Sequence, residues 1–135
     1  MTFIEPYLVN LPKVLDPRGN LSFIEEDVHL PFKIRRVYWI YDVPGGEHRG
    51  GHAFKETEEL IVALSGSFDV VLHSGDKERR FPLSRSYYGL YVPKKTWRML
   101  ENFSTNALAL IVASTDYAES DYVRDFDEFL RMARE

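Results

Sequence analysis

The side chain best suited to proton chemistry is His52, in the middle of the segment GEHRGGHAFKETEE at residues 46–59. An imidazole titrates near neutral pH, so it can take a proton and return it. Glu59 ends the same segment. It could accept a hydrogen bond that orients His52, or it could pair with a cation. The alternative for His52 is a buried histidine with a structural hydrogen bond. The segment as a whole favours acid–base chemistry.

The spacing within this segment resembles the first sequence signature of the cupins, G-x5-H-x-H-x4-E-x6-G. It runs from Gly46 to Gly66, and Phe54 stands in the place of the second histidine. The second cupin signature, P-x-G-x2-H-x3-N, matches residues 93–102, with Lys95 in place of the glycine and Arg98 in place of the histidine. Metal-dependent cupins bind their ion through those histidines and the glutamate.

These two replacements bear on metal binding. A catalytic metal site needs three or four ligands that converge on one ion. Phe54 has no lone pair and Arg98 is always a cation, so only His52 and Glu59 remain. We therefore expect no metal and no other cofactor. A metal cupin, such as a dioxygenase, is disfavoured.

A closer resemblance spans residues 10–130. The motifs are DPRGNL at 16–21, PFKIRRVY at 31–38, RGGHA at 49–53, GLYVP at 89–93, ASTDY at 113–117 and DYVR at 121–124, together with Trp97. In order and spacing they are similar to the dTDP-sugar 3,4-ketoisomerases, metal-free cupins that resemble the C-terminal region of WxcM. The resemblance implies a reaction that moves a carbonyl from C4 to C3 of a dTDP-4-keto-6-deoxyhexose, ahead of transamination to a 3-amino sugar.

The resemblance also implies roles for individual residues. A base takes the C3 proton, which the C4 ketone acidifies, and the enediol is then reprotonated at C4. We expect His52 to be this base. Negative charge that develops on the sugar oxygens needs nearby donors, and Arg98, Arg18 and Tyr38 are the candidates.

The diphosphate needs cationic partners, and a guanidinium suits it better than an ammonium because it bonds phosphate oxygens in pairs. By motif position we expect Arg36, Arg49 and Arg98 to serve. The full set of expected substrate-binding residues is Arg36, Arg49, Lys55, Glu59 and Tyr91.

Phe54 departs from the family pattern. Members usually carry a second histidine there, thought to move protons between the two sugar oxygens, and a phenyl ring cannot do this. Tyr38, Tyr91, His48 or a water could take over. The alternative function is a non-catalytic nucleotide-sugar-binding cupin that has lost the second active-site histidine.

Short apolar and β-branched runs recur about every ten residues, separated by turn residues, which predicts a sandwich or barrel. The expected strands are 21–25, 34–42, 59–64, 68–73, 78–83, 88–92, 98–101 and 107–114. Apolar residues from Tyr122 to Ala133 recur at helical spacing, with Ser120 or Asp121 as the cap. We predict an all-β, cupin-type small β-barrel or jelly roll with one C-terminal α-helix.

The chain of 135 residues has the size of one domain, so we expect a single cupin domain over residues 1–135. It has no cysteine, and its net charge of −4 argues against a nucleic-acid partner. No secretory signal or membrane-length apolar run is visible, so we expect a cytoplasmic protein. The resemblance implies a dTDP-linked keto-deoxysugar as ligand and a homodimer with exchanged N-terminal strands. The apolar supply of residues 1–15 is compatible with that exchange.

Overall fold

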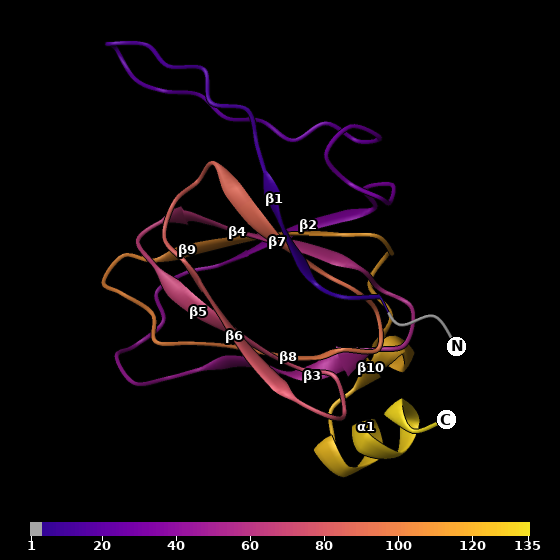
Figure 1. Ribbon diagram of the computed structural model, residues 1–135. Helices are drawn as coiled ribbons and strands as arrows, with labels where there is room; N and C mark the ends of the chain where they lie inside the picture. Colours follow the sequence, from indigo (N-terminus) through magenta and orange to yellow (C-terminus); the bar gives the residue numbers. More distant parts are fainter. Residues whose placement is uncertain (1–3) are drawn as a thin grey trace.

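The computed structural model describes residues 4–135, and two antiparallel five-stranded sheets face each other across its core (Figure 1). The first sheet contains, in spatial order, β1 (Tyr7–Asn10), β7 (Tyr88–Val92), β4 (Glu59–Ser65), β9 (Leu108–Ala113) and β2 (Arg36–Ile40). The second contains β10 (Tyr122–Val123), β3 (Arg49–Phe54), β8 (Trp97–Glu101), β5 (Phe68–His73) and β6 (Glu78–Leu83). The predicted all-β, cupin-like fold is confirmed.

The core lies between the sheets and is built by alternation along the strands. Ile61, Leu90 and Leu100 are fully buried there and come from β4, β7 and β8. The first sheet is covered on its outer face as well, where Leu60 and other apolar side chains pack under the N-terminal segment. A strand buried on both faces reads as a continuous apolar run, and β4 does so in ELIVALS.

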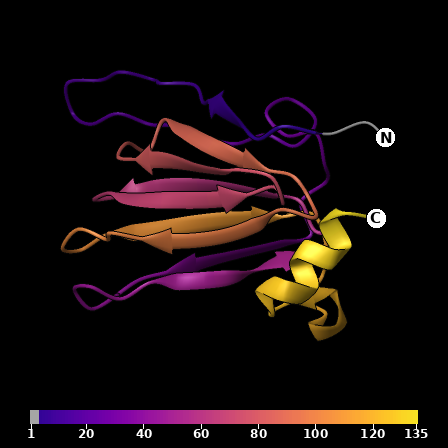
Figure 2. The same cartoon turned by 60° about the horizontal axis from the view of Figure 1, so that its bottom comes forward.

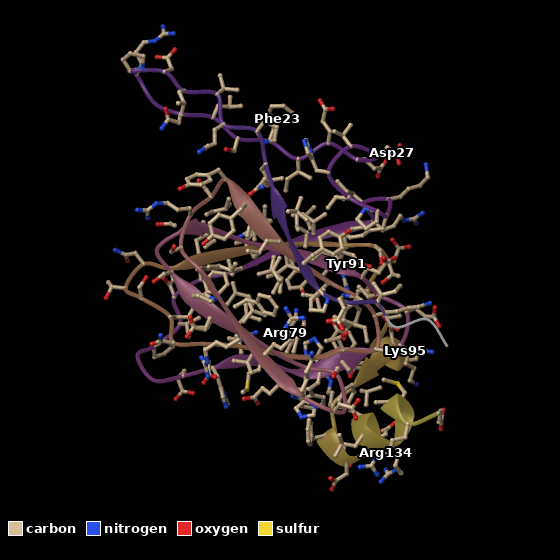
Figure 3. All side chains as sticks on the ribbon, viewed as in Figure 1. Phe23, Asp27, Arg79, Tyr91, Lys95 and Arg134 are labelled. Atoms are coloured by element: carbon tan, nitrogen blue, oxygen red, sulfur yellow. The ribbon has the colours of Figure 1, made fainter. Side chains whose placement is uncertain are left out.

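Strand positions inside the barrel follow the sequence prediction closely, but the N-terminal third does not. Residues 21–25 form no strand, and one isolated bridge from Val14 to Leu21 closes a hairpin instead. This hairpin projects beyond the barrel, on the side where Figure 3 labels Phe23 and Asp27. Strands β1 and β3 were not predicted. Two glycines interrupt the pattern of β3, which is irregular between Arg49 and His52.

The C-terminal helix, α1 (Phe126–Ala133), is shorter than the predicted one. Its cap is Asp125, whose side chain accepts a hydrogen bond from the backbone N–H of Asp127 at 3.0 Å. A short 3-10 turn (Glu119–Asp121) precedes β10, so Ser120 and Asp121 cap no α-helix. Tyr122 pairs with Phe54 as part of β10. Figure 2 shows the helix at one end of the barrel, against the strand ends.

Trp97 anchors this helix, since its ring lies 5.7 Å from that of Phe129, which is fully buried.

Within residues 4–135 no helix is long and apolar enough to cross a membrane.

Candidate active site

A cavity of about 400 Å³ opens between β2 on one sheet and β3 and β10 on the other. Strands β2 and β10 are edge strands of their sheets, and β3 is the neighbour of β10. The cavity is lined by Tyr38, Trp39, Ile40, His48, Arg49, Gly50, His52, Arg98, Tyr122 and Arg124. Two histidines, three arginines and two tyrosines make it a polar, cationic pocket.

His52 lies in β3, and its side chain is buried against the cavity wall. Its Nδ1 is 2.9 Å from the Gly50 carbonyl oxygen, which only accepts, so Nδ1 carries the proton. Nε2 then carries the lone pair, and it has no hydrogen-bond partner among residues 4–135. Burial, together with the neighbouring Arg98 guanidinium, lowers the pKa of His52 to about 3. At neutral pH the imidazole is therefore uncharged and its lone pair is free.

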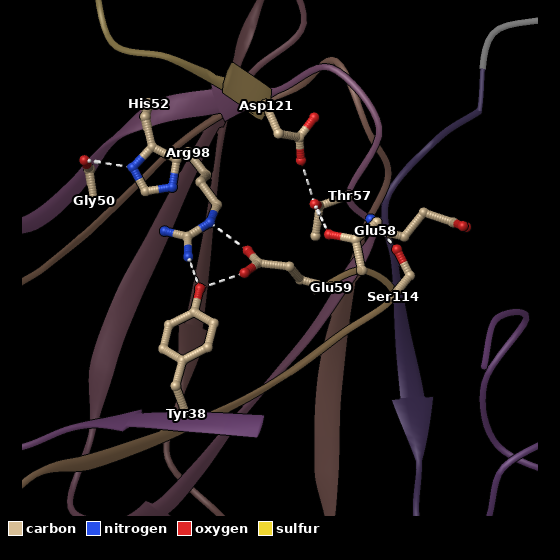
Figure 4. A network of polar contacts seen from close by, with 10 residues as sticks. Tyr38, Gly50, His52, Thr57, Glu58, Glu59, Arg98, Ser114 and Asp121 are labelled. Atoms are coloured by element: carbon tan, nitrogen blue, oxygen red, sulfur yellow. Dashed lines mark hydrogen bonds and ion pairs between the residues drawn. The ribbon is translucent and has the colours of Figure 1, made fainter. Parts of the chain in front are cut away.

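Arg98 is held by a buried network, drawn in Figure 4. Its Nε donates to Glu59 Oε1 at 2.5 Å, and its Nη2 donates to the Tyr38 hydroxyl at 2.6 Å. The Tyr38 hydroxyl in turn donates to Glu59 Oε2. Nη1 of Arg98 has no hydrogen-bond partner in the part of the chain that the structure describes. The guanidinium thus has one nitrogen uncommitted.

Gly50 makes room for that guanidinium. A Cβ at this position would lie 2.9 Å from Arg98 Nη1 and 3.2 Å from the Arg98 carbonyl oxygen. Its φ of +104° is also one that residues with a side chain rarely adopt. Any other residue at position 50 would displace either strand β3 or the arginine.

The protonation states in this network follow from its geometry. Burial disfavours the arginine cation, but the Glu59 carboxylate outweighs it, so the pKa of Arg98 stands above its ordinary value. Burial raises the pKa of Tyr38, although the charge of Arg98 opposes this. Arg98 therefore remains a cation and Tyr38 remains a neutral donor.

The residues present do not suit a metal ion. Glu59, the cupin ligand position, is already neutralised by a fully buried guanidinium. Phe54 stands where metal-binding cupins have their second histidine, and its ring packs edge-on against His52 with centroids 4.8 Å apart. Within residues 4–135, no group of three potential acidic, histidine or cysteine ligands comes together.

The structure brings most of the expected site residues together. His52, Tyr38, Arg98 and Arg49 line the cavity, and Glu59 lies directly behind it. Arg36 is adjacent, with its guanidinium carbon 5.5 Å from the centre of the Tyr38 ring. Glu59 makes its hydrogen bonds to Arg98 and Tyr38, so it does not orient His52.

Three expected residues lie elsewhere. Tyr91 points to the outer face of its sheet, because its neighbours Leu90 and Val92 fill the core. Its hydroxyl donates to Glu58 at 2.5 Å. Lys55, just beyond β3, is exposed and does not line the cavity.

Arg18 is the third. It lies on the projecting hairpin, with its side chain 90% exposed and paired with Asp16 at 2.8 Å. Within one chain, therefore, it does not line the cavity.

Six of the residues that line the pocket were not anticipated as such. His48 was named only as a substitute for the absent histidine, and the others were missed: Trp39, Ile40, Gly50, Tyr122 and Arg124. The DYVR motif that contains Tyr122 and Arg124 was interpreted as the start of the helix. In the fold Asp121 accepts a hydrogen bond from the Thr57 hydroxyl, which lies 64 residues earlier, and spacing along the chain does not reveal such a tertiary contact.

Residues 5–134 match the family described as "FdtA: WxcM-like, C-terminal". The chain belongs to this family. It is 40% identical over 126 residues to a TDP-4-oxo-6-deoxy-alpha-D-glucose-3,4-oxoisomerase of Aneurinibacillus thermoaerophilus, covering 93% of this chain and 91% of that protein.

Solved structures agree. A 3,4-ketoisomerase of Helicobacter canadensis superposes with a TM-score of 0.94 at 38% identity, covering 98% of this chain and all of that one. The WlaRB TDP-quinovose 3,4-ketoisomerase of Campylobacter jejuni gives 0.90 at 39% identity, covering 96% and 99%. This member of the WxcM-like family is an isomerase of the ketoisomerase type.

Proposed function

We propose that this protein converts a dTDP-4-keto-6-deoxyhexose to its 3-keto isomer, as a step in the synthesis of deoxyamino sugars. The observation that carries the proposal is that His52, whose buried Nε2 has no hydrogen-bond partner among residues 4–135, lines a cavity that also holds the Arg98 cation. A related QdtA 3,4-ketoisomerase of Thermoanaerobacterium thermosaccharolyticum, 30% identical, is known as a histidine-to-asparagine variant in complex with TDP-4-keto-6-deoxyglucose.

His52 would act as the base. Its uncharged Nε2 takes the C3 proton, and the imidazolium returns a proton at C4. Proton transfer by a positioned side chain contributes a factor on the order of 100 to 10,000 in rate. The Gly50 carbonyl holds the Nδ1 proton and so leaves the lone pair of the imidazole on Nε2.

Arg98 and Tyr38 would stabilise the negative charge that develops on the sugar oxygens during the proton transfers. Preorganised donors act most strongly in a buried site, where they cost no reorganisation during the reaction. Glu59 takes part by positioning: it holds both donors and does not itself face the cavity.

Arg36 and Arg49 would bind the diphosphate. Arg49 lines the cavity, and the buried Nε of Arg36 has no hydrogen-bond partner within the described residues. We add Arg124, on the same cavity wall as Tyr122, to this group. Lys55 and Tyr91, which lie outside the cavity, are left out of the proposed binding site.

We also propose a homodimer with exchanged N-terminal strands. Exposed apolar side chains along the N-terminal segment support it: Ile4, Leu8, Val14, Leu15, Leu21 and Val28. Residues 1–3 of this segment lie outside the described residues. In such a dimer the projecting hairpin extends away from its own barrel, so Arg18 could act only on a partner's cavity. Light scattering during gel filtration tests this, and a monomer at all concentrations would contradict it.

The decisive experiment is incubation with dTDP-4-keto-6-deoxyglucose in deuterated water, followed by proton NMR. We expect loss of the H3 signal and appearance of the 3-keto isomer. Binding of dTDP without exchange or product would instead indicate the non-catalytic binding cupin. A parallel incubation with a chelator tests the metal, and we expect an unchanged rate. The single-domain, cytoplasmic and no-nucleic-acid assignments stay predictions.

A further inference from the structure

The proposed reaction needs a proton on O4 and loses one from O3, in addition to the transfer between carbons. In this chain Phe54 can carry neither. We infer that the Tyr122 hydroxyl carries the proton between the two sugar oxygens, while His52 carries the proton between the two carbons. This inference rests on the proposed function.

Tyr122 takes up the space beside Phe54. The two residues are direct partners in the pairing of β10 with β3. The Tyr122 ring lies 4.7 Å from the Phe54 ring and 4.9 Å from the His52 ring, measured between centroids. Tyr122 also lines the cavity. A hydroxyl-bearing side chain therefore faces the same cavity as the base, from the strand next to Phe54.

The Tyr122 hydroxyl is not committed to another group. Among residues 4–135 it makes no hydrogen bond to a side chain or to the backbone. The other candidate inside the cavity, Tyr38, donates its proton to Glu59 and accepts from Arg98. Tyr91 faces the opposite side of its sheet. Tyr122 is thus the tyrosine of the cavity whose proton is free to move.

A fixed cation lies beside the Tyr122 ring. The Arg124 guanidinium carbon lies 4.3 Å from the centre of the Tyr122 ring. Arg124 is held there by Glu119, which accepts from its Nε at 2.9 Å and from its Nη2 at 3.1 Å. The other titratable groups around Tyr122 are His52, Tyr117 and Tyr38. A cation close to the ring stabilises the anion that forms when the hydroxyl gives up its proton.

Hydrogen bonds from Asp121 fix the strand that carries Tyr122. The carboxylate of Asp121 accepts hydrogen bonds from the Thr57 hydroxyl and from the Glu56 backbone N–H, the latter at 2.7 Å. The Asp121 carbonyl oxygen also accepts from the Lys55 N–H at 2.9 Å. Figure 4 shows Asp121 and Thr57 on the side of the site away from Tyr38. These contacts tie β10 to the turn after β3.

The proposed proton transfers need no further reactant. His52 Nε2 takes the C3 proton, the C3–H electrons form the C3–C4 double bond, and the C4 carbonyl oxygen receives the Tyr122 proton. The intermediate is a neutral enediol between an imidazolium and a phenolate. The phenolate then takes the proton from O3 as the C3 carbonyl forms, and the imidazolium protonates C4. Both side chains return to their starting states.

The test compares Tyr122→Phe with Tyr117→Phe. Tyr117 is a matched control, because its ring also contacts that of Tyr122 but its hydroxyl is bonded to Glu119 at 2.6 Å. We expect Tyr122→Phe to lower kcat on the order of 100-fold with dTDP affinity retained, and Tyr117→Phe to keep wild-type kcat. His48→Asn is measured as well, because His48 is the other cavity histidine that could carry the proton. If Tyr122→Phe turns over within a factor of about two of wild type, or if His48→Asn carries the loss instead, the inference is overturned.

A second measurement avoids any effect of deleting the hydroxyl. Replacing Tyr122 by 3-fluorotyrosine keeps the shape of the side chain and makes its hydroxyl more acidic. The alkaline limb of the kcat profile should move to lower pH, and an unmoved limb would contradict the inference. Wild-type protein that gives no product would contradict the proposed function itself, so the two failures are distinguishable.

Discussion

His52 and Arg98 lie directly opposite each other in the pairing of β3 with β8. The base therefore faces a permanent cation across the strand pair, inside a buried wall. Desolvation and this cation act in the same direction, and both lower the pKa of the imidazole. The site keeps its base uncharged through position alone, without a carboxylate partner on the histidine.

The pH dependence of the free enzyme follows from this arrangement. A base must be unprotonated to act, and the pKa of His52 is about 3 where an ordinary histidine has one near 6.5. We expect kcat/KM to remain level as the pH falls from 7.5 to about 5, where an ordinary histidine would already have lost most of its activity. Initial rates at low substrate concentration measure this. An acid limb centred near pH 6.5 would contradict it.

The lowered pKa of His52 also makes the free energy of unfolding depend on pH. The dependence is opposite to that of a histidine whose pKa is raised by an acidic partner. The unfolded chain binds a proton on His52 below about pH 6.5, and the folded protein does so only near pH 3. Stability from this residue is therefore present above pH 6.5 and is lost progressively as the pH falls towards 3. Urea unfolding of wild type and His52→Asn at pH 7.5 and pH 5 should show the larger loss in wild type.

Removing the base gives a kinetic prediction. His52→Asn keeps a polar side chain of similar reach but removes the titrating nitrogen. We expect a loss in kcat on the order of 100- to 10,000-fold, with dTDP binding retained because the diphosphate contacts are assigned to arginines. Turnover by NMR and affinity by calorimetry measure the two quantities. Near-normal turnover would mean that another group is the base.

The pair of Glu59 and Arg98 gives a stability prediction. Both side chains are almost fully buried, at 1% and 2% exposed, so Glu59→Gln leaves the guanidinium without a countercharge. Removing one partner of a buried pair is strongly destabilising, and we expect a loss on the order of 3 kcal/mol in the free energy of unfolding. Glu58→Gln, one residue away and only partly buried, is the control and should cost about 1 kcal/mol or less. Equal effects of the two variants would show that the buried pair adds no stability.

The configuration of the product tests whether His52 alone transfers the proton between the two carbons while Tyr122 serves the two oxygens. In the substrate chair the C3 hydrogen is axial, and a galacto product carries its new C4 hydrogen on that same face. One histidine can serve both carbons only in that case, so we expect a 3-keto-6-deoxy-galactose product. The coupling between H4 and H5 should be small, as for an equatorial H4. A large coupling in freshly formed product would require a second carbon acid–base group.

The barrel and the position of His52 in the cavity wall were predictable because their signals are local. Strands β5, β6 and β7 have the predicted bounds, and His52 stands inside a recognisable spacing of residues. Tyr122 was not predictable as a pocket residue, because the same apolar spacing fits a helix and only its pairing with Phe54 makes it a strand. Tyr91 lies outside the cavity for a related reason. A motif identifies a residue but does not say which face of the sheet its side chain occupies, and the burial of Leu90 in the core places Tyr91 on the outer face.

The Glu59–Arg98 ion pair also limits how the site can change by single substitutions. Replacing Arg98 by histidine alone would leave a buried carboxylate without its cation, and Phe54 would still deny an ion its fourth ligand. Replacing Phe54 by histidine alone would bring a further basic group up to a guanidinium that repels any metal. Each step towards an ion-binding pocket thus passes through a form with an uncompensated or repulsive charge, so the site resists conversion unless both positions change together.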